Sequence, residues 1–458
     1  MAMDTVVNSP DPAFPRFHAR PAKGWISDPC GLTYAGGRYH VFFQFNPDSA
    51  RHSGIRWGHL SSPDLVRWDE EPVALTPQPG GPDALGCWTG VVTDDDGVPT
   101  AVYSGGGSGD GRAPVLLARG SRDLTTWTQD GHVAADMPPD PQVTAVRDPF
   151  LFRFRGRRYA LQGAGLGTGR AAVLLYGVDD PRNWTYEGIW FSSDHPLAAK
   201  HLPSDIWECP QLVRVPDSSG AETWLLMASL WLSGDLHEHA NGVGYLLGLV
   251  VPGIAGLPVF TPEAGGRADL GREFYAPQIL ALPERTLLWG WAPEAAGSEG
   301  RPGRSRADTD DAGWAGILTL PRELSVHGGT LAVEPAAELQ AYRGTRLYAG
   351  AAGTLPLPRY AEARVTGGEG RIRLTLRSTR HTVGIQRTVA TQRTVLTEEV
   401  AGGDEFRIFL DASIVEAYRH RSVPTTVRVY PEAGEVWQLE LPHGASADAW
   451  ELRHPEPT

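Results

Sequence analysis

A turn motif that ends in tryptophan recurs three times in the first half of this chain and limits the folds available to it. It occurs as Ser62-Pro63-Asp64-Leu65-Val66-Arg67-Trp68, in looser form as Ser121-Arg122-Asp123-Leu124-Thr125-Thr126-Trp127, and again as Asp180-Pro181-Arg182-Asn183-Trp184. The copies lie roughly 60 residues apart. This spacing is expected for equivalent outer turns in successive blades of a β-propeller.

Short strand-like runs fill the sequence around these turns, and each is bounded by Gly, Pro, Asp or Asn, as in antiparallel hairpins. The 54 Gly and 38 Pro occur together with 15 Trp, 13 Tyr and 13 Phe. They therefore indicate turns within a packed all-β protein rather than disorder. The predicted strands are Tyr39–Phe45, Val98–Tyr103, Val115–Arg119, Phe150–Phe154, Arg158–Gln162, Ala172–Tyr176, Trp224–Ser229 and Thr286–Gly290.

The character of the sequence changes after Arg343, where polar and apolar residues alternate in a series of short runs. This pattern predicts a β-sandwich of about 115 residues. We therefore expect a propeller over residues 1–328, a linker over 329–343 and a sandwich over 344–458. The best helical pattern, Val333 to Arg343, falls in the linker. The alternating runs are Arg371–Leu376, Thr382–Ile385, Arg393–Leu396, Phe406–Leu410, Val415–Tyr418, Thr426–Tyr430 and Val436–Leu439.

Bulk properties exclude several classes of partner. The chain has 458 residues and a net charge of −13, with no basic run, which disfavours nucleic acid and anionic membranes. No apolar stretch is long enough to span a bilayer. Met1 to Gly24 lacks the pattern of a secretory signal, and three cysteines are too few for a disulfide framework. A cytoplasmic location is expected.

Three acidic motifs stand out in the first half of the chain. They are Trp25-Ile26-Ser27-Asp28-Pro29, Arg147-Asp148-Pro149 and Trp207-Glu208-Cys209-Pro210. A carboxylate between rigid turns and aromatic walls is held in place and partly desolvated, as acid and nucleophile chemistry requires. A single Asp-Pro is common turn punctuation. Three such motifs at wide spacing favour a catalytic function.

With these motifs, the chain resembles glycoside hydrolase family 32, the group of invertases, levanases, inulinases and fructan hydrolases. The resemblance covers the chain from about Phe17 to its end and implies an all-β fold, a five-bladed β-propeller followed by a C-terminal β-sandwich. The other motifs that carry it, in family order, are Phe43-Gln44-Phe45-Asn46-Pro47, Trp57-Gly58-His59, Cys87-Trp88-Thr89-Gly90, Glu273-Phe274-Tyr275-Ala276-Pro277-Gln278, Gly313-Trp314-Ala315-Gly316, Pro321-Arg322-Glu323-Leu324 and Phe406 to Glu416.

The resemblance also implies roles for the three acidic residues in a retaining mechanism. Asp28 is the expected nucleophile and Glu208 the acid/base. We expect Trp207 and Cys209 to raise the pKa of Glu208. Asp148 is the expected third carboxylate, binding hydroxyls of the fructosyl unit, and we expect the neighbouring Arg147 to keep it ionised. The residues expected to bind substrate are Ser27, Gln44, Trp57, Trp88, Thr89, Arg147 and Tyr275, whereas packing is the expected role of Trp231 and Trp291.

The sequence departs from the family pattern at several places. Ser27 stands where Asn is usual, and Trp88 adds bulk to the pocket wall. Gln211 replaces an Asp that holds the glucose of sucrose in some members. We therefore expect sucrose to be a poorer substrate than at least one fructosyl-fructose or cyclic fructoside. Cys30, Cys87 and Cys209 are expected to be buried reduced thiols, and neither a metal nor another cofactor is expected.

Three functions remain open from the sequence. The first is a retaining β-fructofuranosidase acting on fructans, fructo-oligosaccharides or small fructosides. The second is a fructosyltransferase, including one that forms or cleaves difructose anhydride, and the third is an inactive carbohydrate-binding propeller. Retention of Asp28, Asp148 and Glu208 disfavours the third. The linkage and the oligomeric state are not specified by these residues, and no cluster of Lys and Arg beside the motifs suits a phosphorylated sugar.

Overall fold

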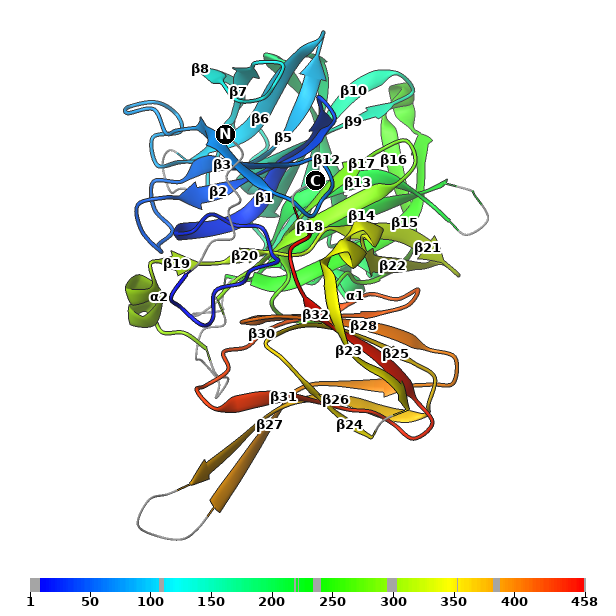
Figure 1. Ribbon diagram of the computed structural model, residues 1–458. Helices are drawn as coiled ribbons and strands as arrows, with labels where there is room; N and C mark the ends of the chain where they lie inside the picture. Colours follow the sequence, from blue (N-terminus) through cyan, green and yellow to red (C-terminus); the bar gives the residue numbers. More distant parts are fainter. Residues whose placement is uncertain are drawn as a thin grey trace.

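The computed structural model describes residues 9–106, 111–217, 220, 222–233, 240–294, 303–351, 353–381 and 388–456, without the side chains of 379–390. Two β-domains lie one above the other, the first coloured blue to green and the second yellow to red (Figure 1). In the described residues the first domain contains five units of four antiparallel strands, named here blades I to V in chain order, of which the third and fourth are joined in one sheet by the pairing of β10 with β13. The chain is thus all-β, as the sequence predicted.

Blades I to III are built from consecutive strands, each sheet following the order of the chain. Blade I contains β1 (Gly24–Ala35), β2 (Arg38–Asn46), β3 (Arg56–Ser62) and β4 (Asp69–Leu75). Blade II contains β5 (Gly86–Asp95), β6 (Val98–Gly106), β7 (Val115–Gly120) and β8 (Trp127–Ala135). Blade III contains β9 (Val143–Phe154), β10 (Arg157–Leu166), β11 (Arg170–Asp180) and β12 (Asn183–Ser192).

Blades IV and V complete the ring. Blade IV contains β13 (Ile206–Pro216), β14 (Glu222–Trp231), β15 (Ala240–Pro252) and β16 (Pro258–Arg267), with α1 (Pro196–His201) before it and the 3₁₀ turn η1 (Ile254–Gly256) within it. Blade V contains β17 (Tyr275–Ala281), β18 (Thr286–Ala292), β21 (Arg322–His327) and β22 (Thr330–Pro335). The chain between β18 and β21 forms α2 (Arg306–Ala312), β19 (Trp314–Ala315) and β20 (Ile317–Leu318).

The innermost strand of each blade contacts the innermost strand of the next, in the order β1, β5, β9, β13 and β17, and β17 contacts β1 again. The strand β19 pairs in parallel with β1, and β20 pairs with β18. The segment between β18 and β21 of blade V therefore reaches back to blade I and fastens the two ends of the ring together. The five inner strands surround one central axis, where side chains from all the blades can meet.

The recurring tryptophan turns connect the third and fourth strands of blades I, II and III, as predicted. In each turn the indole N–H donates a hydrogen bond to a carbonyl three residues earlier, from Trp68 to Leu65, from Trp127 to Leu124 and from Trp184 to Pro181. The repeated sequence is thus a local turn structure that fixes its own tryptophan.

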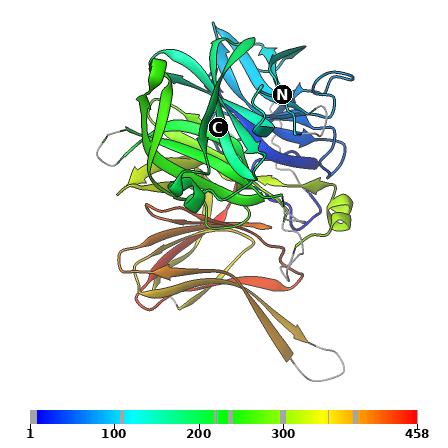
Figure 2. The ribbon, with the colours of Figure 1, turned by 180° about the vertical axis from the view of Figure 1, so that it is seen from behind.

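The second domain is a sandwich of two antiparallel sheets joined to blade V by the 3₁₀ helix η2 (Ala337–Tyr342). One sheet contains β23 (Arg343–Ala351), β25 (Tyr360–Thr366), β28 (Glu405–Asp411), β29 (Ile414–Arg419), β30 (Thr425–Arg428) and β32 (Ser446–Leu452). The other contains β24 (Thr354–Leu357), β26 (Gly370–His381), β27 (Thr388–Val400) and β31 (Glu435–Glu440). The long β26–β27 hairpin extends away from the propeller (Figure 2).

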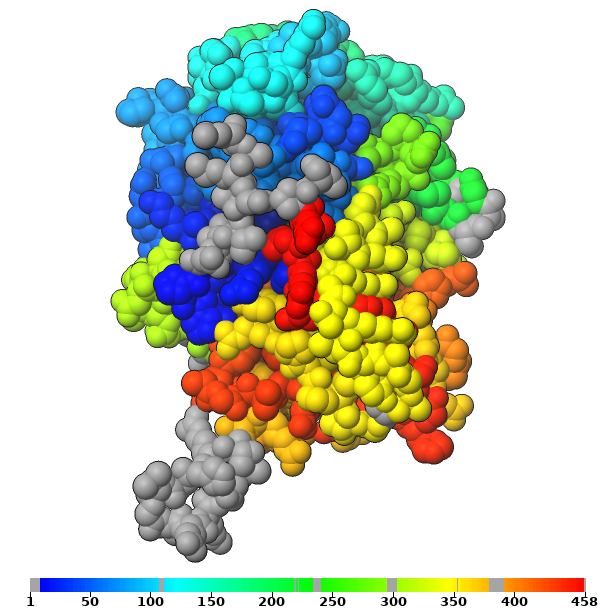
Figure 3. Space-filling model, in the orientation of Figure 1, coloured from blue at the N-terminus to red at the C-terminus, as the bar shows by residue number. Residues whose placement is uncertain are grey.

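The domain boundary differs from the predicted one. Residues 329–343 were expected to be a linker, but β22 lies within them and pairs with β21 of the propeller. Leu331 and Val333 are buried in the propeller core, which explains why this stretch belongs to it. The propeller therefore ends at Pro335, and the predicted helical stretch contributes only the 3₁₀ turn η2. In the space-filling view the yellow chain that follows lies directly against the propeller (Figure 3).

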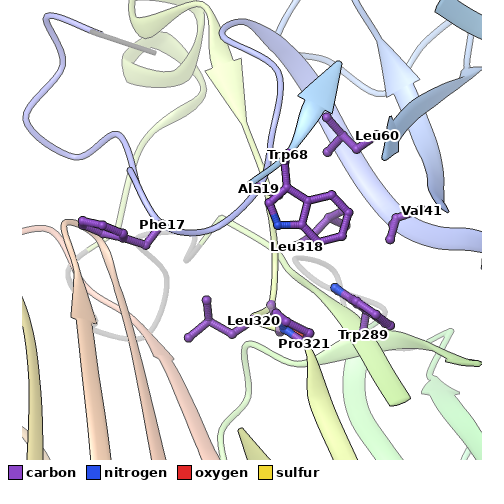
Figure 4. A pocket seen from close by; sticks show the side chains of 10 residues that line it. Phe17, Ala19, Val41, Leu60, Trp68, Trp289, Leu318, Leu320 and Pro321 are labelled. Atoms are coloured by element: carbon purple, nitrogen blue, oxygen red, sulfur yellow. The ribbon is translucent and has the colours of Figure 1, made fainter. Parts of the chain in front are cut away.

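A narrow pocket lies where the N-terminal segment crosses between blades I and V (Figure 4). Its walls are apolar, including Trp68, Trp289 and Leu318, and its volume is about 10 Å³. This is close to the space of one water molecule. We interpret it as a packing gap. None of the helices in the described part of the chain has the length and apolarity needed to cross a membrane.

Candidate active site

Each inner strand carries the same irregularity at the same depth along the central axis. Two of its residues lie opposite a single residue of the second strand, which is a β-bulge. A bulge bends its strand and redirects its side chains, so five of them aim side chains into one central space. The bulged pairs are Ser27–Asp28, Trp88–Thr89, Asp148–Pro149, Cys209–Pro210 and Ala276–Pro277.

The backbone explains why proline accompanies the acidic motifs. The first bulged residue has a positive φ in three blades, 59° at Asp148, 48° at Cys209 and 48° at Ala276, and proline follows in each. Proline is tolerated at a bulge because the strand there gives up a ladder hydrogen bond. The motifs are therefore strand bulges, and the expectation that rigid turns flank the carboxylates is wrong.

The N–H groups freed by the bulges bond to the preceding blade. Asp148 N–H donates to Ser104 Oγ at 2.8 Å, and Ala276 N–H donates to Ser229 Oγ at 3.0 Å. Cys209 N–H donates instead to the Asp148 carboxylate, at 2.9 Å from Oδ2. These bonds lock neighbouring bulges to one another, so the geometry of the centre is set by backbone as well as by side chains.

Asp28 is held by two neutral donors. Thr89 Oγ1 donates to Asp28 Oδ2 at 2.7 Å, and Gln44 Nε2 lies 3.1 Å from the same oxygen. Gln44 Nε2 also donates to Thr89 Oγ1 at 2.7 Å. Gln44 is the residue of β2 that faces the bulge of β1, which places its amide beside the carboxylate. This network fixes the orientation of Asp28 without placing a cation on it.

Glu208 lies between a cation and a phenol. Arg147 Nη1 is 2.7 Å from Glu208 Oε1, and Tyr275 O–H donates to Glu208 Oε2 at 2.7 Å. The Arg147 guanidinium also lies 6.0 Å from the centre of the Trp231 ring. The predicted apolar surroundings of Glu208 are thus replaced by an ion pair on one side. The pKa of Glu208 stays a prediction.

Asp148 is buried, and its surroundings disfavour the ionised form of its carboxyl group. Burial and the neighbouring Glu208 carboxylate raise the pKa of Asp148 to about 8, although Arg147 lowers it. The expectation that Arg147 keeps Asp148 ionised is therefore wrong, because Arg147 is bound to Glu208 instead. Near neutral pH the three carboxylates together retain a proton.

The three cysteines are free buried thiols. Cys209 Sγ lies 3.8 Å from Asp28 Oδ2 and 3.6 Å from Asp148 Oδ2, so this thiol connects two of the carboxylates. Burial raises the pKa of Cys30, Cys87 and Cys209, which keeps the thiols protonated. Among the residues that the structure describes, no three His, Cys, Asp or Glu side chains are grouped to hold a metal ion.

The carboxylates open into a cavity of about 580 Å³, a volume typical of small-molecule sites. Trp231 and Trp291, for which packing was expected, also line it. The sequence did not single out His52, Glu294 or Arg306, whose neighbours gave no motif signal. The residues lining the cavity are Trp25, Ser27, Asp28, Gln44, His52, Trp88, Arg147, Asp148, Glu208, Trp231, Ala240, Tyr275, Trp291, Pro293, Glu294 and Arg306.

Two residues expected at the substrate lie behind the wall. Trp57 is fully buried, and its indole N–H donates to the carbonyl of Trp88 at 2.9 Å, so it supports the wall from outside the cavity. Gln211 is also buried, and its side chain accepts a hydrogen bond from Ile279 N–H of blade V at 3.1 Å. Gln211 joins two blades, so the expectation that it alters contacts to a leaving group is wrong.

Comparison with known proteins identifies relatives of the whole propeller. The model of the glycosyl hydrolases family 32 N-terminal domain matches residues 18–335, ending where β22 ends. The sucrose-6-phosphate hydrolase of Escherichia coli is 30% identical over 339 residues, and the raffinose invertase of Escherichia coli is 33% identical over 338 residues. Each match covers 72% of this chain and 66% of the relative.

A solved structure shares the fold over both domains. The family 32 β-fructofuranosidase of Bombyx mori superposes with a TM-score of 0.77 at 24% identity, covering 99% of this chain and 97% of that one. The family model confirms the predicted family, and this superposition confirms the predicted fold, a five-bladed propeller followed by a sandwich.

Proposed function

The chain belongs to glycoside hydrolase family 32, and we propose that it is a retaining β-fructofuranosidase that removes terminal β-fructofuranosyl units from fructans, fructo-oligosaccharides or small fructosides. One observation carries the proposal. Three carboxylates, Asp28 and Asp148 within bulges and Glu208 directly before one, converge from three separate blades at one cavity, each with different hydrogen-bond partners. A retaining glycosidase needs two carboxyl groups in distinct roles, and such differences of environment separate the roles.

In the first step Asp28 attacks the anomeric carbon of the fructosyl unit and forms a covalent ester as the glycosidic C–O bond breaks. The bonds from Thr89 and Gln44 hold the attacking carboxylate in one orientation, which lowers the entropic part of the barrier. Glu208 gives a proton to the departing oxygen, so the leaving group departs as a neutral alcohol.

In the second step Glu208, now ionised, takes a proton from water while the water oxygen attacks the anomeric carbon and the ester bond to Asp28 breaks. Arg147 and Tyr275 stabilise the ionised form of Glu208 in this interval. The two inversions at carbon leave the configuration unchanged, and fructose departs.

Asp148 binds ring hydroxyls of the fructosyl unit in this proposal, together with Ser27, Gln44 and Arg147. Its raised pKa means that the ligand-free cavity keeps a proton near neutral pH. That proton is available for the acid role if it lies on Glu208 when the glycosidic bond breaks. Trp88, Trp231 and Trp291 supply aromatic faces against which sugar rings pack.

A substrate panel tests the proposal. The chain is incubated with an aryl β-fructofuranoside, sucrose, kestoses, inulin, levan and difructose anhydride, and the products are separated by chromatography. NMR during the reaction assigns the anomer released first. We expect free fructose with retained configuration, and sucrose outperformed by another substrate. Inverted product would contradict the mechanism, and transfer products in place of fructose would indicate a fructosyltransferase.

A further inference from the structure

Glu294 lines the same cavity as the three carboxylates but belongs to no bulge. It follows β18 of blade V, and its side chain is 14% exposed. The mechanism above leaves this fourth acidic residue without a role. A carboxylate kept at the wall of a sugar-sized cavity requires an explanation, because burial of an acidic group costs free energy unless it is paired.

The partners of Glu294 come largely from the sandwich. Arg428 Nη2 lies 3.1 Å from Glu294 Oε1, and the Tyr430 hydroxyl donates to Glu294 Oε2. Gly316 N–H donates to Oε1 at 3.0 Å. Arg428 is itself fully buried and donates to the carbonyl of Ala292 at 3.1 Å, just before Glu294 in the chain. The second domain thus holds one wall of the cavity in place.

These contacts keep Glu294 charged. Burial opposes ionisation, but Arg428, the Tyr430 hydrogen bond and Arg304 outweigh it and hold the pKa of Glu294 below its usual range. The other titratable groups on this wall differ. Burial lowers the pKa of His52, so it is neutral near pH 7, and Arg306 is exposed, where water and salt screen its charge. Glu294 is therefore a fixed carboxylate of the cavity wall, and Arg428 pairs with it.

Contacts of blade V place Glu294 beyond Trp291, between the strand of Tyr275 and the start of β1. Tyr275, which bonds Glu208, packs edge-on against Trp291 with ring centres 6.5 Å apart, and Trp291 packs against Trp25 at 5.8 Å. Glu294 follows Trp291 by three residues. In the proposed function the fructosyl unit binds at Asp28, Asp148 and Glu208, which leaves the wall at Trp291 and Glu294 for the sugar attached to it.

We propose that Glu294 accepts hydrogen bonds from hydroxyls of the sugar leaving group and selects an uncharged leaving group over a phosphorylated one, with Arg428 and Tyr430 as positioning residues. This inference rests on the proposed β-fructofuranosidase function. A hydroxyl donates to an ionised carboxylate in a strong, charge-assisted bond. A phosphate at the same place would meet a fixed charge of its own sign.

The test compares three classes of substrate that share a fructosyl unit. Sucrose and 1-kestose carry an uncharged sugar leaving group, sucrose 6-phosphate carries an anionic one, and an aryl β-fructofuranoside carries no sugar hydroxyls there. In Glu294→Gln, kcat/KM on sucrose and 1-kestose should fall by roughly tenfold or more, chiefly through KM, and by clearly less on the aryl substrate. The ratio of kcat/KM for sucrose 6-phosphate to that for sucrose should rise at least tenfold.

The positioning role has its own variants. Tyr430→Phe removes one hydrogen bond from Glu294 and keeps the ring, so it should reproduce the same pattern with a smaller change. Glu263→Gln, on the exposed outer strand β16, is the matched control and should behave as the wild type. Equal losses on aryl and sugar substrates, or an unchanged ratio for the phosphorylated substrate, would overturn this inference alone. A wild type inactive on the aryl fructoside would overturn the proposed function and this inference with it.

Discussion

At the scale of single residues, three carboxylates in or directly before the bulges of three inner strands meet different surroundings. Asp28 receives hydrogen bonds from neutral donors, Glu208 contacts a guanidinium and a phenol, and Asp148 accepts a backbone N–H in a buried position. Asp28 is the second bulged residue of its strand, Asp148 is the first of its strand, and Glu208 precedes the bulge, so each carboxylate enters the site from a different position. The difference comes from the partner residues, because each carboxylate is bonded from a different set of strands in its own and the neighbouring blades.

The nucleophile role of Asp28 predicts a large kinetic effect without a structural one. Asp28→Asn keeps the shape and the contacts to Thr89 and Gln44, but an amide cannot form the ester, so kcat should fall by several orders of magnitude. Turnover of an aryl fructoside measures the loss, and circular dichroism checks the fold. Asp179→Asn, at an exposed position of β11, is the matched control. Near-normal kcat in Asp28→Asn would remove Asp28 from this role.

The acid role of Glu208 predicts a dependence on the leaving group. Glu208→Gln should be nearly inactive on sugar fructosides, whose leaving oxygen needs a proton, and should lose less on an activated aryl fructoside. The two kcat values, each divided by that of the wild type, give the comparison. Similar losses on both substrates would contradict the assignment.

The raised pKa of Asp148 predicts a dependence of stability on pH. The folded protein binds this proton more tightly than the unfolded chain, so the contribution is present below the unfolded pKa near 4 and is lost as pH rises through about 8. The amide of the Asp148→Asn variant cannot ionise. This variant should therefore gain stability relative to the wild type between pH 5 and pH 9, by at least about 1 kcal/mol. Urea unfolding at both pH values measures this, and a constant difference would show that Asp148 does not titrate in this range.

At the scale of elements, the sequence predicted regular strands and, among the bulged inner strands, only the part of β9 that follows its bulge. Runs such as Arg158–Gln162 and Ala172–Tyr176 fall inside β10 and β11 because their apolar residues are continuous and their ends carry turn residues. At the acidic motifs the sequence predicts turns, because proline interrupts the residue pattern of a β-strand. The bulge that accommodates the proline depends on pairing with the next strand, and a single strand carries no sign of that pairing.

The outer wall of the site could not be predicted for a related reason. Asp28, Asp148 and Glu208 carry a motif within a few residues of sequence. Glu294 is held in the cavity wall by Arg428, which lies 134 residues away in the sequence and belongs to the other domain. Trp57 is the opposite case. It belongs to a family motif, but it lies outside the cavity and its indole donates a hydrogen bond to the carbonyl of Trp88. Only the packing of strands separates these cases.

The bulge of β17 gives a prediction about backbone conformation. Ala276 has φ of 48°, where a β-branched residue is strained and glycine is not. Ala276→Val should cost about 1–2 kcal/mol of unfolding free energy and lower kcat by displacing Tyr275 from Glu208. Ala276→Gly is the matched control and should stay within about 1 kcal/mol of the wild type. Urea unfolding and aryl fructoside kinetics measure the stability and the kcat of both variants. Wild-type stability and kcat in Ala276→Val would show that the bulge does not constrain the site.

At the scale of the whole molecule, a buried network of charges joins the two domains. Arg322 of blade V lies 2.8 Å from Asp269 and 2.9 Å from Glu416 of the sandwich. His18 of the N-terminal segment lies 2.7 Å from Asp411 and 3.1 Å from Glu416. Removing one partner of such a network leaves a buried charge uncompensated, so each member is expected to matter for stability.

His18 gives this interface a measurable pH dependence. Burial alone would lower its pKa, but the hydrogen bonds to Asp411 and Glu416 outweigh burial and raise it to about 9. The stabilisation is thus complete below the unfolded pKa near 6.5 and is lost as pH rises through about 9. Glu416, whose pKa the Arg322 and His18 contacts lower to about 2 despite burial, loses its contribution only in acid. Between pH 6 and pH 10, His18 is therefore the member of this pair that titrates.

His18→Gln should be less stable than the wild type at pH 6 by up to about 3 kcal/mol, since each unit of pKa shift corresponds to about 1.4 kcal/mol. The difference should shrink as pH rises through 9, because the wild type then loses its proton and its ion pairs. Urea unfolding across pH 6 to 10 measures both proteins, and His443→Gln, at an exposed turn of the sandwich, is the control. A difference that stays constant across this range would mean that shape alone, and not the charge of His18, holds the N-terminal segment between the two domains.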